Sequence, residues 1–207
     1  MAFKYACFIS YRHSHEPGVQ KFYESFRREL AVQVGLYLPG MSVYLDTGRL
    51  RGGDFFNREL AYALCSSVCM ISLYSPYYFD LHHPYAAREY QAMVRLERKR
   101  LSSMPQEAQN KGLIIPIIIR GSLPEEVKRE RQFYTLDLLT PGDLKKPKSL
   151  LALRQVAEDI YMRYEAFRAA GEDPCGICED FDFPSEIEIK DWLTGITSPH
   201  QKMPWRR

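Results

Sequence analysis

Two short segments of this 207-residue chain carry side chains that can bind a nucleotide. The first, at residues 10–13, reads Ser-Tyr-Arg-His and combines hydroxyl and cationic donors with an aromatic ring. Such a set suits a phosphate group and a planar base. The alternative is that Arg12 and His13 are solvated loop residues, and composition alone does not decide between the two.

The second segment contains Tyr85 and Glu89, four residues apart in a predicted helix, so that both should project from one face. A single carboxylate cannot supply the acid/base pair of an ordinary glycosidase, which needs a second Asp or Glu about 5–10 Å away. It could stabilise an oxocarbenium-like centre or orient a ribose hydroxyl, as a nucleosidase requires. The spacing alone favours another interpretation, an exposed helix glutamate paired with Arg88, Lys99 or a nearby arginine.

Other kinds of site find little support in the sequence. It contains no G-x-G-x-x-G, no Walker-type glycine loop and no G-x-S-x-G elbow, which argues against dehydrogenases, P-loop ATPases and serine hydrolases. Cys175-x-x-Cys178 has half of a zinc-knuckle spacing without a second pair, so we expect no metal site. The five cysteines lack a framework spacing, which predicts thiols in a reducing compartment.

Charge and hydropathy narrow the class of partner. Lys and Arg total 28 against 26 Asp and Glu, a net charge of +2, which argues against a nucleic-acid binder with a large basic patch. The longest apolar run, residues 113–119, is too short for a bilayer and contains Pro116. The first ten residues do not resemble a signal peptide. We therefore expect a cytoplasmic protein without membrane contact.

Apolar runs bounded by turn signals predict the strands and helices that position the two candidate segments around residues 10–13 and 85–89. Continuous hydrophobicity predicts buried strands, and three-to-four spacing predicts helices between them. Strands are expected at residues 5–10, 42–45, 68–74 and 113–119, with a weaker one at 133–136. Helices are expected from Pro17, after Asp54, from Pro84 to about Arg98, and over a last stripe that ends at Gly171.

This alternation predicts an α/β fold with a five-stranded parallel sheet of order 2-1-3-4-5 and helices on both faces. Ligands of such sheets bind beyond the carboxyl ends of the strands, which singles out the loops at residues 11–16 and 75–83. Residues 1–170 form the predicted domain, and residues 171–207 a C-terminal extension. The apolar side chains of this extension, Trp192 among them, predict that most of it docks on another surface.

Three motifs of the chain resemble, in order and spacing, those of bacterial TIR domains. They read FISYRH at residues 8–13, YLDTGRLRGGDFF at 44–56 and LYSPYYFDLHHPYAAREYQAM at 73–93. The resemblance covers about residues 5–167 and implies the same flavodoxin-like five-stranded fold. Many TIR domains of bacteria and plants cleave NAD+ at the nicotinamide-ribose bond, giving nicotinamide and ADP-ribose or a cyclic isomer. By resemblance, NAD+ would be a substrate of this chain, with no separate cofactor.

The resemblance also implies roles for individual residues. Glu89 takes the position of the family's catalytic glutamate, holding the ribose hydroxyls and stabilising positive charge as nicotinamide departs. The implied substrate-binding residues are Ser10, Tyr11, Arg12, Asp46, Arg49, Ser75 and Tyr85. Residues 46–55 correspond to the BB loop, which closes over the substrate and mediates TIR–TIR assembly, with glycines supplying flexibility. The chain departs from the family where Tyr85-Ala86 replaces a Trp-Cys pair and where residues 79–84 lack a usual serine.

Three functions remain open at this point. The first is an NAD+ hydrolase or cyclase of prokaryotic immune signalling, activated by self-association or by a sensor protein. The second is a non-catalytic TIR adaptor that acts through TIR–TIR or partner contacts. The third is an unrelated flavodoxin-like binding module. The extension at residues 171–207 is either a docking or assembly segment or a segment packed against the last helix.

Overall fold

A central sheet of five parallel strands organises the chain. The computed structural model describes residues 3–14, 16–46, 54–102, 104, 106–136, 141–171 and 174–196. The strands lie in the order β2-β1-β3-β4-β5. Their bounds are β1 Tyr5–Tyr11, β2 Ser42–Leu45, β3 Ser67–Tyr74, β4 Ile114–Ile118 and β5 Tyr134–Thr135. The predicted flavodoxin-like fold and strand order are therefore confirmed.

The central strand β3 is buried along its whole length because both faces of the sheet are covered. Met70 and Tyr74 belong to the core on one side of the sheet, whereas Ile71 and Leu73 belong to the core on the other. Successive side chains of a strand point to opposite faces, so a two-sided sheet requires an unbroken apolar run.

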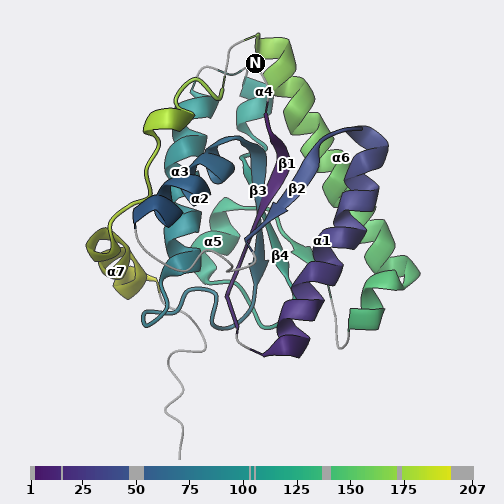
Figure 1. The fold of residues 1–207 in the computed structure, drawn as a ribbon, viewed down its shortest axis with the longest axis horizontal. Coiled ribbons are helices and arrows are strands. Elements are labelled where there is room, and N and C mark those ends of the chain that lie inside the picture. The colour runs from purple at the N-terminus through teal and green to yellow at the C-terminus, as the bar shows by residue number, and fades with distance from the viewer. Residues whose placement is uncertain are drawn as a thin grey trace, which may run out of the picture.

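The helices form two layers around this sheet. In Figure 1, α1 and α6 cover one face, and α2 and α3 cover the other. Pro17 opens α1, where its missing amide hydrogen leaves no bond unmade, and Gly171 caps α6 in the left-handed conformation (φ 72°). The helices are α1 Pro17–Tyr37, α2 Asp54–Cys65, α3 Tyr85–Leu101, α4 Gln106–Gln109, α5 Glu125–Glu130, α6 Pro147–Ala170 and α7 Glu186–Gly195, with short 3-10 helices η1 Pro141–Lys145 and η2 Cys178–Asp180.

The described part of the extension, residues 174–196, returns across α2 and α3, as Figure 1 shows. Arg88 Nε in α3 donates a hydrogen bond to the Pro184 carbonyl (3.1 Å), and Arg95 Nη2 lies 2.7 Å from Glu188 Oε1. The Trp192 ring of α7 stacks on Tyr90, with centroids 5.9 Å apart. The extension therefore packs on the α2 and α3 side, and not on the last helix alone. Residues 197–207 lie outside the described residues.

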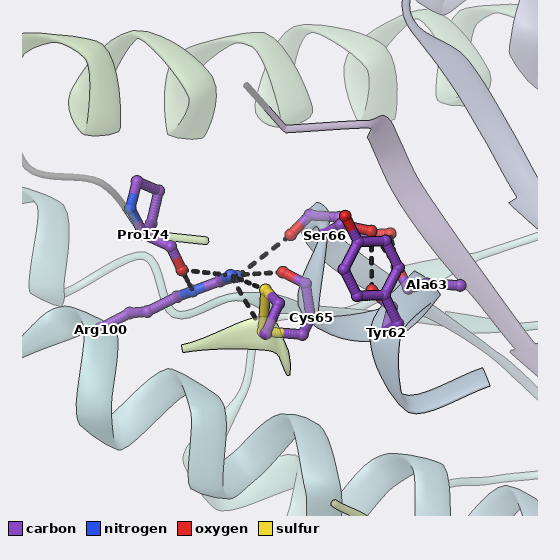
Figure 2. The surroundings of a disulfide bond; sticks show 8 residues. Tyr62, Ala63, Cys65, Ser66, Arg100 and Pro174 are labelled. Carbon is purple, nitrogen blue, oxygen red and sulfur yellow. Dashed lines mark hydrogen bonds between the residues drawn. A yellow bond between two sulfur atoms is a disulfide. The ribbon is translucent and has the colours of Figure 1, made fainter. Parts of the chain in front are cut away.

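A disulfide joins this extension to the domain. Cys65, the last residue of α2, is bonded to Cys178 in η2 across 113 positions of the sequence (Figure 2). The prediction of thiols is therefore wrong for Cys65 and Cys178. The two residues meet because the extension folds back over α2, and the spacing of cysteines in the sequence does not show this. Cys7 and Cys69 are buried thiols.

No described helix combines the length and apolar character that a bilayer span requires.

Candidate functional site

The candidate site lies at the carboxyl ends of β1 and β3, where α3 begins. Ser10 is near the end of β1, and Glu89 stands in the second turn of α3. Between β3 and α3, the Tyr78 amide donates a hydrogen bond to the Ser75 carbonyl (2.9 Å). This turn directs the Tyr78 ring back toward β1. Ser75 is half-buried and contributes its backbone to this turn.

Glu89 is buried against the sheet. Only 4% of it is exposed, and its Oε2 accepts a hydrogen bond from Ser10 Oγ (2.5 Å). The same hydroxyl lies 2.7 Å from the Tyr78 hydroxyl. Ser10, Tyr78 and Glu89 thus form a buried polar triad, joining β1, the β3–α3 loop and α3. The interpretation of Glu89 as an exposed helix glutamate is wrong.

Burial makes the proton affinity of Glu89 unusual. Loss of hydration raises its pKa from the ordinary 4.5 to about 8, since the charged form is disfavoured in an apolar surrounding. The hydrogen bond from Ser10 opposes this rise, the negative charge of Asp46 adds to it, and Arg88 opposes it. At neutral pH the resting protein therefore holds Glu89 mainly as an uncharged carboxylic acid. Strongly shifted carboxyl groups of this kind are common at functional sites.

A second group of side chains ties the ends of β1 and β2 together. The Tyr11 hydroxyl donates a hydrogen bond to the Asp46 carbonyl, and the His13 ring stacks on Tyr11 with centroids 4.7 Å apart. His13 Nε2 lies 3.4 Å from Asp46 Oδ2. Asp46 is buried, and its charge raises the pKa of Tyr11 in addition to the larger effect of burial. Tyr11 and Asp46 are therefore brought together at the predicted crevice.

Arg12 lies over the same edge of the sheet in a partly buried position. Its Nη2 is 3.4 Å from Asp80 Oδ2, and its guanidinium carbon lies 5.1 Å from the centroid of the Tyr77 ring. Its Nε is buried without a hydrogen-bond partner among the described residues. Arg12 is therefore partly buried and paired, whereas His13 is exposed, so the interpretation of both as solvated loop residues holds only for the exposure of His13. A buried donor without an acceptor costs about 1–3 kcal/mol, and an anionic ligand would satisfy it.

Tyr85 does not share the surroundings of Glu89. It is 55% exposed, whereas Glu89 is 4% exposed. As the first residue of α3, Tyr85 lines a separate hollow of about 350 Å³ together with His82, His83, Glu186 and Lys190. Four residues turn a helix through about 400°, so the two residues leave α3 in similar directions, but Tyr85 lies at the exposed start of the helix and Glu89 one turn further along, where it is buried. The two side chains therefore do not meet in one site.

The predicted BB loop over residues 46–55 can be placed only at its ends. Asp46 is described, but residues 47–53, which include Arg49, lie outside the described residues. No cluster of three or more His, Cys, Asp or Glu able to hold a metal occurs in the described part of the chain.

Two contacts of the site are not predicted by the sequence. Tyr78 is expected among the aromatic residues around the nucleotide, but its hydrogen bond with Ser10 is not. Asp80 is not expected as the partner of Arg12. A signal for Asp80 existed, because the loops that follow β1 and β3 meet at one edge of the sheet and carry opposite charges.

Comparison with known proteins is consistent with this geometry. A family model described as TIR domain matches residues 7–151, from β1 into α6. No curated protein and no solved structure matches the chain.

Proposed function

Since the chain belongs to the TIR domain family, we propose that it cleaves the nicotinamide-ribose bond of NAD+. The products would be nicotinamide and ADP-ribose or a cyclic isomer of ADP-ribose. The observation that carries this proposal is the buried carboxyl of Glu89, hydrogen-bonded by Ser10 at the edge of the sheet where ligands of such folds bind.

The chemistry needs a negative charge beside the ribose. When the glycosidic bond breaks, its electron pair leaves with the pyridinium ring, which becomes neutral nicotinamide, and the ribose becomes oxocarbenium-like. Ionised Glu89 would stabilise that cation, while Ser10 Oγ holds the carboxylate in place. Water then attacks the anomeric carbon and loses a proton, or a ring nitrogen of the adenine attacks to close a cycle.

The positive charge of NAD+ itself favours the ionised form of Glu89. An opposite charge within about 4–6 Å lowers the pKa of a carboxyl group. The pyridinium ring would therefore counteract the burial that raises the pKa of Glu89 in the resting protein. Glu89 would thus ionise when NAD+ binds. Its negative charge would then be present mainly in the complex with the substrate, where it stabilises the ribose cation.

Arg12 would bind the pyrophosphate. Its buried Nε has no acceptor among the described residues, and a phosphate oxygen would accept from it. Tyr11, Asp46 and Ser75 lie at the carboxyl ends of β1, β2 and β3 and would shape the substrate site. Tyr85 and Arg49 stay predictions as substrate-binding residues, since Tyr85 is turned toward another hollow and Arg49 lies outside the described residues.

The resting structure covers Glu89, so catalysis would require a rearrangement. With 4% of its surface exposed, Glu89 cannot contact a ribose unless Tyr78 or a neighbouring loop moves. Self-association through the BB loop, or binding of a sensor protein, would supply that movement. A cytoplasmic location and a role in prokaryotic immune signalling are parts of the same proposal.

The burial of Glu89 also favours a second candidate, a TIR adaptor that acts by TIR–TIR or partner contacts without catalysis. In that case the polar triad of Ser10, Tyr78 and Glu89 would serve only to join β1 to α3. The two candidates differ in one observable, the release of nicotinamide.

The test is incubation of the full chain with NAD+ at low and high protein concentration, with nicotinamide and the ribose product resolved by chromatography. The wild type should release nicotinamide at high concentration, and Glu89→Gln should not. Glu158→Gln, which changes an exposed glutamate of α6 on the other face of the sheet, is the matched control and should behave as the wild type. Equal inactivity of the wild type and Glu89→Gln at every concentration would favour the adaptor.

A further inference from the structure

The disulfide between α2 and the extension lies beside a third cysteine and a buried arginine. We propose that Cys65, Cys175 and Cys178 form a thiol-exchange site. In this site Cys175 attacks Cys178 and displaces Cys65, with Arg100 stabilising the displaced thiolate. The proposal is independent of NAD+ cleavage.

Cys175 stands within reach of Cys178 because the chain turns between them. The Cys178 amide donates a hydrogen bond to the Cys175 carbonyl (3.0 Å), which closes a turn of four residues. The Cα atoms at the ends of such a turn lie less than about 7 Å apart, which overlaps the range that a disulfide spans. Both residues pack against the core on the α2 and α3 side of the sheet. The backbone spacing therefore permits a Cys175–Cys178 disulfide as an alternative to the Cys65–Cys178 one.

Arg100 supplies the charge that such an exchange requires. Its Nη2 lies 3.7 Å from Cys65 Sγ and 4.0 Å from Cys178 Sγ. Figure 2 shows its side chain reaching from α3 to the disulfide, with hydrogen bonds to the carbonyls of Pro174 and Cys65. Arg100 Nη2 lies 2.7 Å from the carbonyl oxygen of Pro174. The guanidinium is therefore hydrogen-bonded both to α2, through Cys65, and to the extension, through Pro174. A cation at this place stabilises a departing thiolate, which speeds the exchange.

The step is neutral in oxidation state. Cys175 loses its proton to water, and its thiolate sulfur bonds to Cys178 Sγ. The bond between Cys178 and Cys65 breaks, and Cys65 leaves with the electron pair as a thiolate beside Arg100. One disulfide is replaced by another, so no oxidant or reductant takes part.

The exchange changes what the disulfide connects. In the Cys65–Cys178 form the extension is covalently bound to α2, whereas in the Cys175–Cys178 form the disulfide lies wholly within the extension. The extension then keeps only its non-covalent contacts, such as those of Arg88 and Arg95 with Pro184 and Glu188. The extension thereby becomes separable from α2 without reduction.

The experiment maps thiols in the full chain purified without reductant. The protein is held at about pH 8 for minutes to hours, the usual time of uncatalysed disulfide rearrangement. It is then quenched in acid, labelled with a maleimide and digested for mass spectrometry. In the wild type, label should accumulate on Cys65 together with a Cys175–Cys178 disulfide. In Cys175→Ser, label on Cys65 should be at least about tenfold lower, because the attacking thiol is missing.

Two further variants separate exchange from loss of fold. Cys69→Ala removes a buried thiol of β3 away from the disulfide and should leave the label on Cys65 unchanged. Arg100→Gln, checked by circular dichroism for native structure, should slow the appearance of the label. If the wild type carries no more label on Cys65 than Cys175→Ser does, the exchange site is refuted, whatever the behaviour of Arg100→Gln.

Discussion

Replacing Glu89 by glutamine should make the protein more stable, increasingly so at higher pH. The pKa of Glu89 is about 8 in the folded protein against an ordinary 4.5. The folded state therefore holds a proton that the unfolded state releases between these values, and stability falls as pH rises through this window. Each pH unit costs about 1.4 kcal/mol, which amounts to about 3 kcal/mol at pH 7 and about 4 kcal/mol at pH 8.

Glutamine has nearly the same shape and does not ionise, so it should accept the hydrogen bond of Ser10 without this loss. The assay is urea unfolding of the wild type and Glu89→Gln between about pH 5 and 8, with the Cys65–Cys178 disulfide intact. The two stability curves should nearly meet at pH 5 and diverge above it. Parallel curves over the whole range would refute the assignment of a buried, protonated Glu89.

Four more outcomes are expected. The kcat/KM for NAD+ should rise with pH up to about 8, because the ionised form of Glu89 stabilises the cation. Arg12→Ala should lower kcat/KM roughly ten- to hundredfold in steady-state assays, since a charge-assisted hydrogen bond contributes about 1.5–3 kcal/mol. Trp192→Ala should reduce the free energy of unfolding by at least about 2 kcal/mol, because two ring contacts of about 1 kcal/mol each are lost in addition to the apolar surface that Trp192 buries. Replacing Cys65 and Cys178 by alanine should lower it by up to about 4–5 kcal/mol, the loop-closure value for a span of 113 residues.

Each of these outcomes has a contrary result. A flat pH profile would contradict the catalytic use of Glu89, and an unchanged kcat/KM in Arg12→Ala would remove Arg12 from the substrate site. Trp192→Phe keeps a ring and should lose less stability than Trp192→Ala. An unfolding midpoint that is the same with and without Cys65–Cys178 would show that the disulfide does not constrain the unfolded chain.

The fold could be predicted because its signals are local. The apolar run at residues 68–74 is continuous because β3 is buried on both faces. Such a run in the sequence therefore predicts a parallel sheet that is covered on both sides. Pro17 and Gly171 mark the start of α1 and the end of α6 through backbone preferences that each residue carries by itself. No strand end differs from the predicted one by more than one residue. For example, β3 begins at Ser67 and β1 ends at Tyr11.

The candidate site could be predicted only in part, because its contacts join distant segments. The sequence motif singled out Glu89, but its burial depends on Tyr78 and Ser10, which lie on other elements. Helical spacing placed Tyr85 on the same face as Glu89, yet the first residue of a helix is free to point into a neighbouring hollow. The Cys65–Cys178 disulfide depends on how the extension folds back, which no local pattern encodes.

The proposed function depends on Glu89 as the catalytic carboxylate of an NAD+ nucleosidase. Its most direct test is the rate of nicotinamide release per protein molecule, measured over a rising concentration of the wild type and of Glu89→Gln. Release should increase with concentration in the wild type and be absent in Glu89→Gln, although the variant is the more stable protein. Equal release by the two proteins would rule out a catalytic role of Glu89.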